Sequence, residues 1–121
     1  SLIKLKKINL SKSNVLLMGY SFKENCSDTR NTQIKKLFNE FDLKSKKVEI
    51  FDPNIDHKLL NTKIKNSFIL KPKNNYYDII IIGVAHDIFK KIGSTKINRY
   101  SKKKSIIFDL KNIFKNKFYS V

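Results

Sequence analysis

A polar segment at residues 19–32, GYSFKENCSDTRNT, contains the side chains in this sequence most suited to binding an anion. It follows a short apolar run and includes Lys23 and Arg30, the latter one of only two arginines in the chain. An ammonium group between the carboxyl end of a strand and the amino terminus of a helix suits a pyrophosphate. The segment has a single glycine, Gly19, so it is not the G-x-G-x-x-G turn of a simple NAD-binding domain.

Three further polar side chains follow apolar runs later in the chain. Asp52 ends the run KVEIFD, where a dinucleotide-binding fold has a ribose-binding acid. Without the glycine fingerprint, we expect Asp52 to cap the following turn instead. His86 follows the run YDIIIIGVA, and we expect a neutral capping or loop-packing histidine rather than a general base. Lys111 follows a third such run, SIIFDL.

A scaffold of alternating strands and helices would bring these side chains together. Apolar runs indicate buried strands, and apolar residues three and four apart indicate helices. The predicted strands are 14–19, 47–52, 77–85 and 105–110, with a short edge strand at 67–70. The predicted helices are 34–41, a weaker one at 55–64, and one that begins at 88 and runs into the segment KINRYSKKK at 96–104.

This alternation predicts βαβ units and a Rossmann-like, three-layer α/β/α fold with a mainly parallel sheet. Ligands of such sheets bind outside the carboxyl ends of the strands, so the polar residues above are expected at one edge. We expect a single domain at 14–121. Residues 1–13, with Leu2, Leu5 and Ile8 on one helical stripe, are expected to be the end of an interdomain connector.

The charge is strongly unbalanced, since 26 Lys+Arg against 10 Asp+Glu give a net charge of +16. Such a balance favours polyanionic partners, and a basic nucleic-acid-binding α/β module is the alternative interpretation. However, all but two of the basic residues are lysine, and they are spread along the chain without interleaved aromatic residues. A bias toward Lys, Ile and Asn, which have AT-rich codons, would produce this charge without a nucleic-acid partner.

Several other classes are disfavoured. Cys26 is the only cysteine, so no internal disulfide can form, which fits a reducing cytoplasm. The longest apolar run, 79–85, is too short to cross a bilayer, and the first residues have no signal-peptide pattern. Cys26, His57 and His86 are too scattered for a metal site. Only Glu24 follows the first strand closely, whereas a phosphoacceptor receiver domain needs an acidic cluster there to hold Mg²⁺.

Four motifs, in order, resemble the carboxyl-terminal UDP-binding domain of the UDP-glucose/GDP-mannose dehydrogenases. They are GYSFKENCSDTRNT at 19–32, VEIFDP at 48–53, YDIIIIGVAHDIF at 77–89 and IIFDLKNIF at 106–114. The F-K-E-N-C form together with V-A-H is most similar to the dehydrogenases that act on UDP-N-acetylhexosamines, of the mannosamine, glucosamine or galactosamine type.

The resemblance implies a C6 alcohol oxidised to a carboxylate with two NAD and a cysteine thiohemiacetal, in the synthesis of polysaccharides. The family's catalytic cysteine lies in a G-G-x-C-x-x-K-D-type segment, which does not occur here. This chain is therefore expected to bind a UDP-sugar without catalysing its oxidation. The resemblance also implies that an NAD-binding domain, which binds most of the NAD, and a central domain complete the enzyme, and that the full-length protein is a homodimer.

The resemblance further implies roles for single residues. Lys23 matches the family lysine that contacts the UDP-sugar, and Phe22 beside it either packs on the ligand or anchors the loop. Lys111 matches a substrate-facing basic residue that is commonly arginine, so bidentate geometry is lost here. Arg30 matches an interface arginine that reaches toward the NAD of the other domain. Asp28 is expected to pair with Arg30, and Cys26 to be a packed loop residue.

Overall fold

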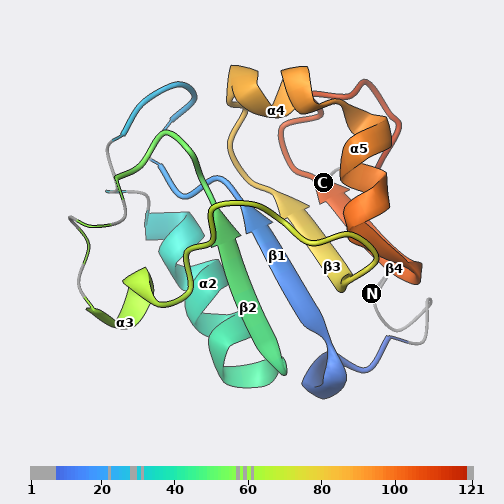
Figure 1. The fold of residues 1–121 in the computed structure, drawn as a ribbon, viewed down its shortest axis with the longest axis horizontal. Coiled ribbons are helices and arrows are strands. Elements are labelled where there is room, and N and C mark those ends of the chain that lie inside the picture. The colour runs from blue at the N-terminus through green and yellow to red at the C-terminus, as the bar shows by residue number, and fades with distance from the viewer. Residues whose placement is uncertain are drawn as a thin grey trace.

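The computed structural model of this protein describes residues 8–21, 23–27, 30, 32–56, 58, 60 and 62–119. Strands and helices alternate along the chain, as Figure 1 shows. In order they are η1 (Leu10–Lys12), β1 (Asn14–Met18), α2 (Thr32–Lys44), β2 (Lys47–Phe51), α3 (Thr62–Lys65), β3 (Tyr77–Ile82), α4 (Asp87–Ile92), α5 (Ser94–Tyr100) and β4 (Ser101–Asp109). No helix in the described part of the chain is long and apolar enough to cross a membrane.

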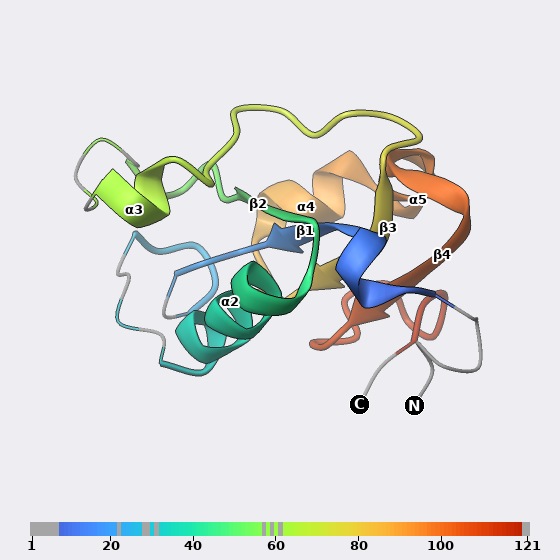
Figure 2. The same ribbon diagram turned by 90° about the horizontal axis from the view of Figure 1, so that it is seen from below.

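The four strands form one sheet in the order β2-β1-β3-β4, with every neighbouring pair parallel. Helix α2 covers one face, and α4 and α5 cover the other together with the long connection before β3, as Figure 2 shows. The predicted Rossmann-like three-layer fold is therefore confirmed. The chain passes from β1 to β2 on one side and then to β3 on the other, which makes the carboxyl ends of β1 and β3 the topological switch point.

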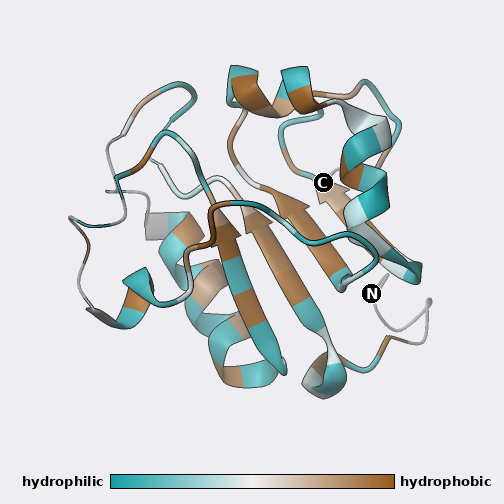
Figure 3. Ribbon diagram, viewed as in Figure 1, coloured by the Kyte–Doolittle hydropathy of each residue, from teal (hydrophilic) through white to brown (hydrophobic). Residues whose placement is uncertain are grey.

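The two central strands are buried on both faces, which explains their unbroken apolar runs. Figure 3 shows β1 and β3 as apolar along their length except near their beginnings, whereas β2 at the edge alternates. On the α2 face, Val15 and Ile79 pack with Phe38, while on the opposite face Leu16 and Ile80 pack near α4 and α5. All five side chains are at most 1% exposed.

The helix predicted to run from 88 into 96–104 differs from the structure in two respects. It is interrupted at Gly93, where φ is +87°, so α4 and α5 are separate short helices. The lysine-rich segment 101–104 is the beginning of β4, and Ser101 pairs with Tyr77. Because Lys103 and Lys104 are exposed on this terminal strand, the segment has no apolar pattern that would identify it. Lysines at such a position discourage association of the sheet edge with other chains.

Two weaker predictions are also corrected. Among the described residues of 55–64, the α-helical segment is α3, which begins only at Thr62, while Ile55 lies in a turn in which its N–H donates to the carbonyl of Asp52. The predicted edge strand at 67–70 is reduced to a single parallel bridge between Ile50 and Phe68. Most of the predicted connector, residues 1–7, lies outside the described residues, and Ile8 packs against the core on the α2 face.

A buried carboxylate that the sequence did not reveal lies on β2. The side chain of Glu49 is 5% exposed, and it accepts hydrogen bonds from the Tyr77 hydroxyl at 2.7 Å and the Lys73 ammonium at 3.1 Å. Burial by itself raises the pKa of Glu49, but these two hydrogen bonds and the nearby charge of Lys47 outweigh it, so the pKa lies below its ordinary value of 4.5. Burial and the bond to Glu49 raise the pKa of Tyr77.

Substituting Glu49→Gln is expected to lower the free energy of unfolding by about 2 kcal/mol at neutral pH, because charge-assisted hydrogen bonds are lost. The folded-state pKa is depressed, so this stabilisation is present above the unfolded-state value and lost as the pH falls through the folded-state value. Urea unfolding across acidic buffers should show the difference between wild type and variant shrinking. The exposed Glu40→Gln is the matched control, and a difference that stays constant with pH would contradict this account.

Candidate functional site

The candidate site is the carboxyl edge of the sheet at the switch point, where the loop after β1 meets the loop after β3. Gly19 begins the first loop with φ of +98°, a conformation that favours glycine. A β-carbon at this position would lie 2.7 Å from the Cβ of Val84. The two loops therefore touch through the backbone of Gly19, and no larger residue fits between them.

Asp52 joins the end of β2 to the first loop. Its Oδ2 accepts hydrogen bonds from the backbone N–H groups of Tyr20 at 2.7 Å and Ser21 at 3.1 Å, while Oδ1 accepts from the N–H of Asn54 at 3.0 Å. The predicted turn-capping role is confirmed by the bond to Asn54. The residue is 3% exposed, so both oxygens are used within the protein.

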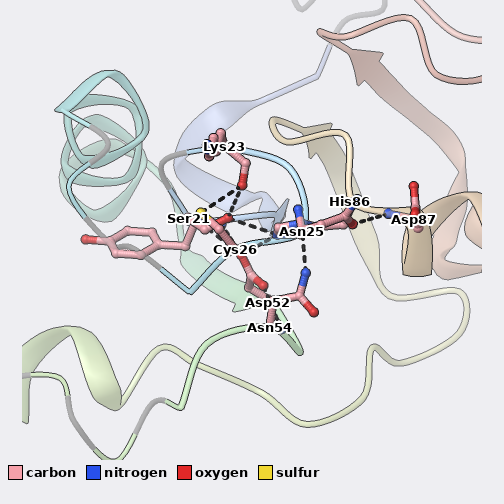
Figure 4. Close-up of polar contacts among 9 residues, drawn as sticks. Ser21, Lys23, Asn25, Cys26, Asp52, Asn54, His86 and Asp87 are labelled. Carbon is pink, nitrogen blue, oxygen red and sulfur yellow. Dashed lines mark hydrogen bonds and ion pairs between the residues drawn. The ribbon is translucent and has the colours of Figure 1, made fainter.

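His86 lies between the two loops and is fully buried. Its Nδ1 is 2.8 Å from the backbone nitrogen of Asn25, and its Nε2 is 3.0 Å from both Asp52 Oδ2 and Ser21 Oγ (Figure 4). A backbone N–H can only donate, so Nδ1 accepts, and the ring of neutral His86 carries its proton on Nε2. The predicted capping or loop-packing role is thus confirmed: His86 is the N-cap residue of α4 through its backbone, and its ring packs against the first loop instead of making a side-chain cap bond.

Asn25 gives the first loop its shape. Its φ is +59°, a left-handed conformation that asparagine tolerates better than most residues. Its Oδ1 accepts a hydrogen bond from the N–H of Asp87 at 2.9 Å, which ties the loop to the first turn of α4. The side-chain amide of Asn54 also lies 2.9 Å from His86 Nδ1. Three strand ends therefore contribute to one polar cluster.

Lys23 lies at the exposed bend of this loop. Its carbonyl oxygen accepts hydrogen bonds from Ser21 Oγ at 2.9 Å and from the Cys26 thiol at 3.3 Å, as Figure 4 shows. Cys26 is partly buried and makes a loop contact, as predicted. The carbonyl group of Lys23 is thus held by two side chains of its own loop, and within the described part of the chain its ammonium group has no hydrogen-bond or ion-pair partner.

The other predicted site residues are more dispersed. Lys111 is exposed in the turn after β4, where buried Asp109 accepts from the N–H groups of Ile113 at 3.1 Å and Phe114 at 3.0 Å. It shares the carboxyl edge with Lys23, but β3 lies between the strands that precede the two lysines.

On the first loop, Arg30 is exposed just before α2. Phe22 and Asp28 lie outside the described residues, so the predicted pairing of Asp28 with Arg30 stays a prediction. The substrate contact predicted for Phe22 likewise remains a prediction.

The residues that sequence reasoning missed are Ser21, Asn25, Asn54 and Glu49. Asn54 follows Asp52 by two residues, and a D-P-N turn with a strand before it was the available signal. For Ser21 and Asn25 the signal was their place in the long first motif. Each of these residues has a partner between 28 and 65 positions away along the chain, a separation that local patterns do not reveal.

This edge does not have the features of an NAD site. The first loop lacks the glycine fingerprint, and Gly19 is packed against Val84. Asp52, at the position of a ribose-binding acid, already accepts from three backbone N–H groups and lies beside His86. Its carboxylate is therefore not available to a ribose, and the residues at this edge do not fit NAD.

Comparison with known proteins places the chain in a family. A family model described as "UDP-glucose/GDP-mannose dehydrogenase family, UDP binding domain" matches residues 16–116. The UDP-N-acetyl-D-glucosamine 6-dehydrogenase of Salmonella typhi is 40% identical over 108 residues, which cover 89% of this chain and 25% of that protein. The enzyme of the same name from Pseudomonas aeruginosa is 34% identical over 106 residues, covering 88% of this chain and 25% of that protein.

A solved structure, that of the UDP-N-acetyl-D-mannosamine dehydrogenase of Pyrococcus horikoshii, has the same fold. The TM-score is 0.72 at 22% identity, and the match covers 98% of this chain and 28% of that one. The chain spans about a quarter of the length of these relatives. The family match extends from β1 to beyond β4 and so includes all three loops of the polar cluster. The chain belongs to the UDP-glucose/GDP-mannose dehydrogenase family and corresponds to its UDP-binding domain.

Proposed function

We propose that this chain binds the UDP moiety of a UDP-N-acetylhexosamine within an NAD-dependent 6-dehydrogenase. The enzyme would oxidise the sugar C6 alcohol to a carboxylate for polysaccharide synthesis in the cytoplasm. The observation that carries the proposal is the first loop, which exposes Lys23 at the switch point of a parallel sheet in a chain of this family. The exposed ammonium of Lys23 provides a positive charge where open α/β sheets bind ligands.

Three further residues of this chain have proposed roles in binding the substrate or facing the cofactor. Phe22 and Lys111 are proposed to contact the UDP-sugar, and Arg30 to face NAD held mainly by a separate domain. The domain itself is proposed to begin at residue 14, after a connector. When bound, NAD would accept the hydride, and this chain's residues would bind and orient the UDP moiety of the substrate. Full-length protein is proposed to be a homodimer, with the catalytic cysteine outside this chain.

The decisive experiment uses the full-length protein that contains this chain. NADH formation is measured with UDP-N-acetylglucosamine and UDP-N-acetylmannosamine, with and without NAD, and UDP and GDP are compared as ligands by calorimetry. Sugar-dependent NADH formation together with preference for UDP is expected. Absence of oxidation of every UDP-N-acetylhexosamine, with no UDP binding, would sink the proposal.

Lys23→Ala is expected to weaken UDP binding by the full-length protein about tenfold or more, because a charge-assisted contact to phosphate is lost. Lys36→Ala is the matched control, since Lys36 is an exposed lysine on α2. Isothermal calorimetry of both variants with UDP measures the difference. Equal affinities for Lys23→Ala and wild type would remove Lys23 from the site.

A further inference from the structure

The first loop contacts the His86 ring on both sides of Lys23. Ser21, two residues before Lys23, places its Oγ 3.0 Å from Nε2. Asn25, two residues after Lys23, donates its backbone N–H to Nδ1 at 2.8 Å. One fully buried imidazole therefore bridges the two ends of the bend that carries the lysine.

The donors and acceptors around the His86 ring determine which ring nitrogen carries the proton. Ser21 uses its hydroxyl proton on the carbonyl of Lys23, so toward Nε2 its oxygen can only accept. Asp52 Oδ2 accepts from two backbone N–H groups and also faces Nε2 at 3.0 Å. The Nε2 proton thus points at Asp52 and Ser21, while the Nδ1 lone pair faces the backbone N–H of Asn25 at 2.8 Å and the side-chain amide of Asn54 at 2.9 Å. Nδ1 therefore accepts from the end of the bend at Asn25, and Nε2 donates toward Asp52 and the beginning of the bend at Ser21.

From this geometry we infer that His86 is a positioning residue for the UDP site. It holds the bend so that the Lys23 ammonium reaches the pyrophosphate, and Asp52 in turn orients the imidazole. His86 is fully buried, so it does not itself contact the ligand. This inference rests on the proposed function and adds to it the residue that sets the affinity of the lysine contact.

Two conservative substitutions separate the tasks of the two ring nitrogens. In His86→Asn the side-chain oxygen stands near the Nδ1 position and can still accept from the N–H of Asn25. In His86→Gln the amide reaches the Nε2 position and can still donate to Asp52, but the acceptor for Asn25 is lost. Because the Asn25 bond closes the bend, His86→Gln is expected to weaken UDP binding about tenfold, and His86→Asn less than about threefold.

A double-mutant cycle with Lys23→Ala distinguishes positioning from mere stability. If His86 acts through Lys23, His86→Gln should have little further effect on UDP affinity in the Lys23→Ala background. In the full-length enzyme, His86→Gln should raise KM for the UDP-sugar and change kcat by less than about twofold. Glu49→Gln is the control for destabilisation alone, since Glu49 lies in a separate cluster, and it should leave both constants unchanged.

The outcomes are distinct. Equal affinity losses for His86→Gln in the wild-type and Lys23→Ala backgrounds, or a greater loss for His86→Asn than for His86→Gln, would overturn the positioning role. Failure of the wild-type protein to bind UDP would instead overturn the proposed function before any variant is compared. The melting temperature of each variant shows that folded protein is being measured.

Discussion

Asp52→Asn is expected to lower the free energy of unfolding by about 3 kcal/mol, since buried donors then lack an acceptor. Asp52 Oδ2 accepts from the N–H groups of Tyr20 and Ser21, and Oδ1 accepts from that of Asn54. An asparagine has only one acceptor oxygen. Whichever way its amide is turned, an NH₂ group faces at least one N–H group in a site that is 3% exposed.

Thermal and urea unfolding measure this effect, which corresponds to a fall in melting temperature on the order of 10 °C. Asp42→Asn is the matched control, because Asp42 is exposed on α2 and the substitution is chemically identical. We expect Asp42→Asn to change stability by less than about 0.5 kcal/mol. If the two variants were equally stable, the carboxylate of Asp52 would not be needed to fix the first loop.

Gly19→Ala is expected to destabilise the protein by about 3 kcal/mol or more. The backbone has φ of +98°, which an alanine adopts only with strain, and the new Cβ would meet Val84 Cβ at 2.7 Å and its backbone nitrogen at 3.0 Å. The neighbouring backbone is fixed, because Gly19 donates to the carbonyl of Phe51 and Gly83 donates to that of Met18. Neither loop can move away without loss of hydrogen bonds to the sheet.

Gly93→Ala distinguishes the two causes of the destabilisation expected for Gly19→Ala, which are backbone strain and the contact with Val84. Gly93 has a similar φ of +87°, but a β-carbon built there meets no atom within 4 Å. Its substitution should therefore cost only the conformational part, about 1 kcal/mol. Urea unfolding of both variants measures the difference, which reports the contact between the loops after β1 and β3. Equal losses for the two glycines would show that this contact is not close in solution.

Much of the fold could be predicted because burial leaves a strong local pattern. The runs at β1 and β3 are apolar on both faces, and the helical spacing of Ile34 and Phe38 is the face that α2 buries. The start of β4 could not be predicted in this way. Its lysines lie on the last strand of the sheet, where exposure removes the alternation that marks a strand, and pairing with β3 alone determines its structure.

The position of the candidate site could be predicted from the sequence, but the contacts between its side chains could not. The loops at the strand ends follow from the topology, and the motif of 19–32 identifies the loop that matters. The contacts of His86 could not be inferred, because an N-terminal helical position suggests capping, whereas its ring faces a loop 61 residues earlier in the chain. Such a contact depends on how two crossovers place the strand ends relative to each other.

The polar cluster around His86 also limits how this domain can be altered. The segment that carries Lys23 owes its shape to groups from the ends of β2 and β3, rather than to its own residues alone. Transplanting 19–27 into another α/β domain would therefore transfer a sequence without its conformation. Asp52, Asn54 and His86 would have to be transplanted with it. The loops after β1, β2 and β3 therefore have to be exchanged together if the first loop is to keep its conformation.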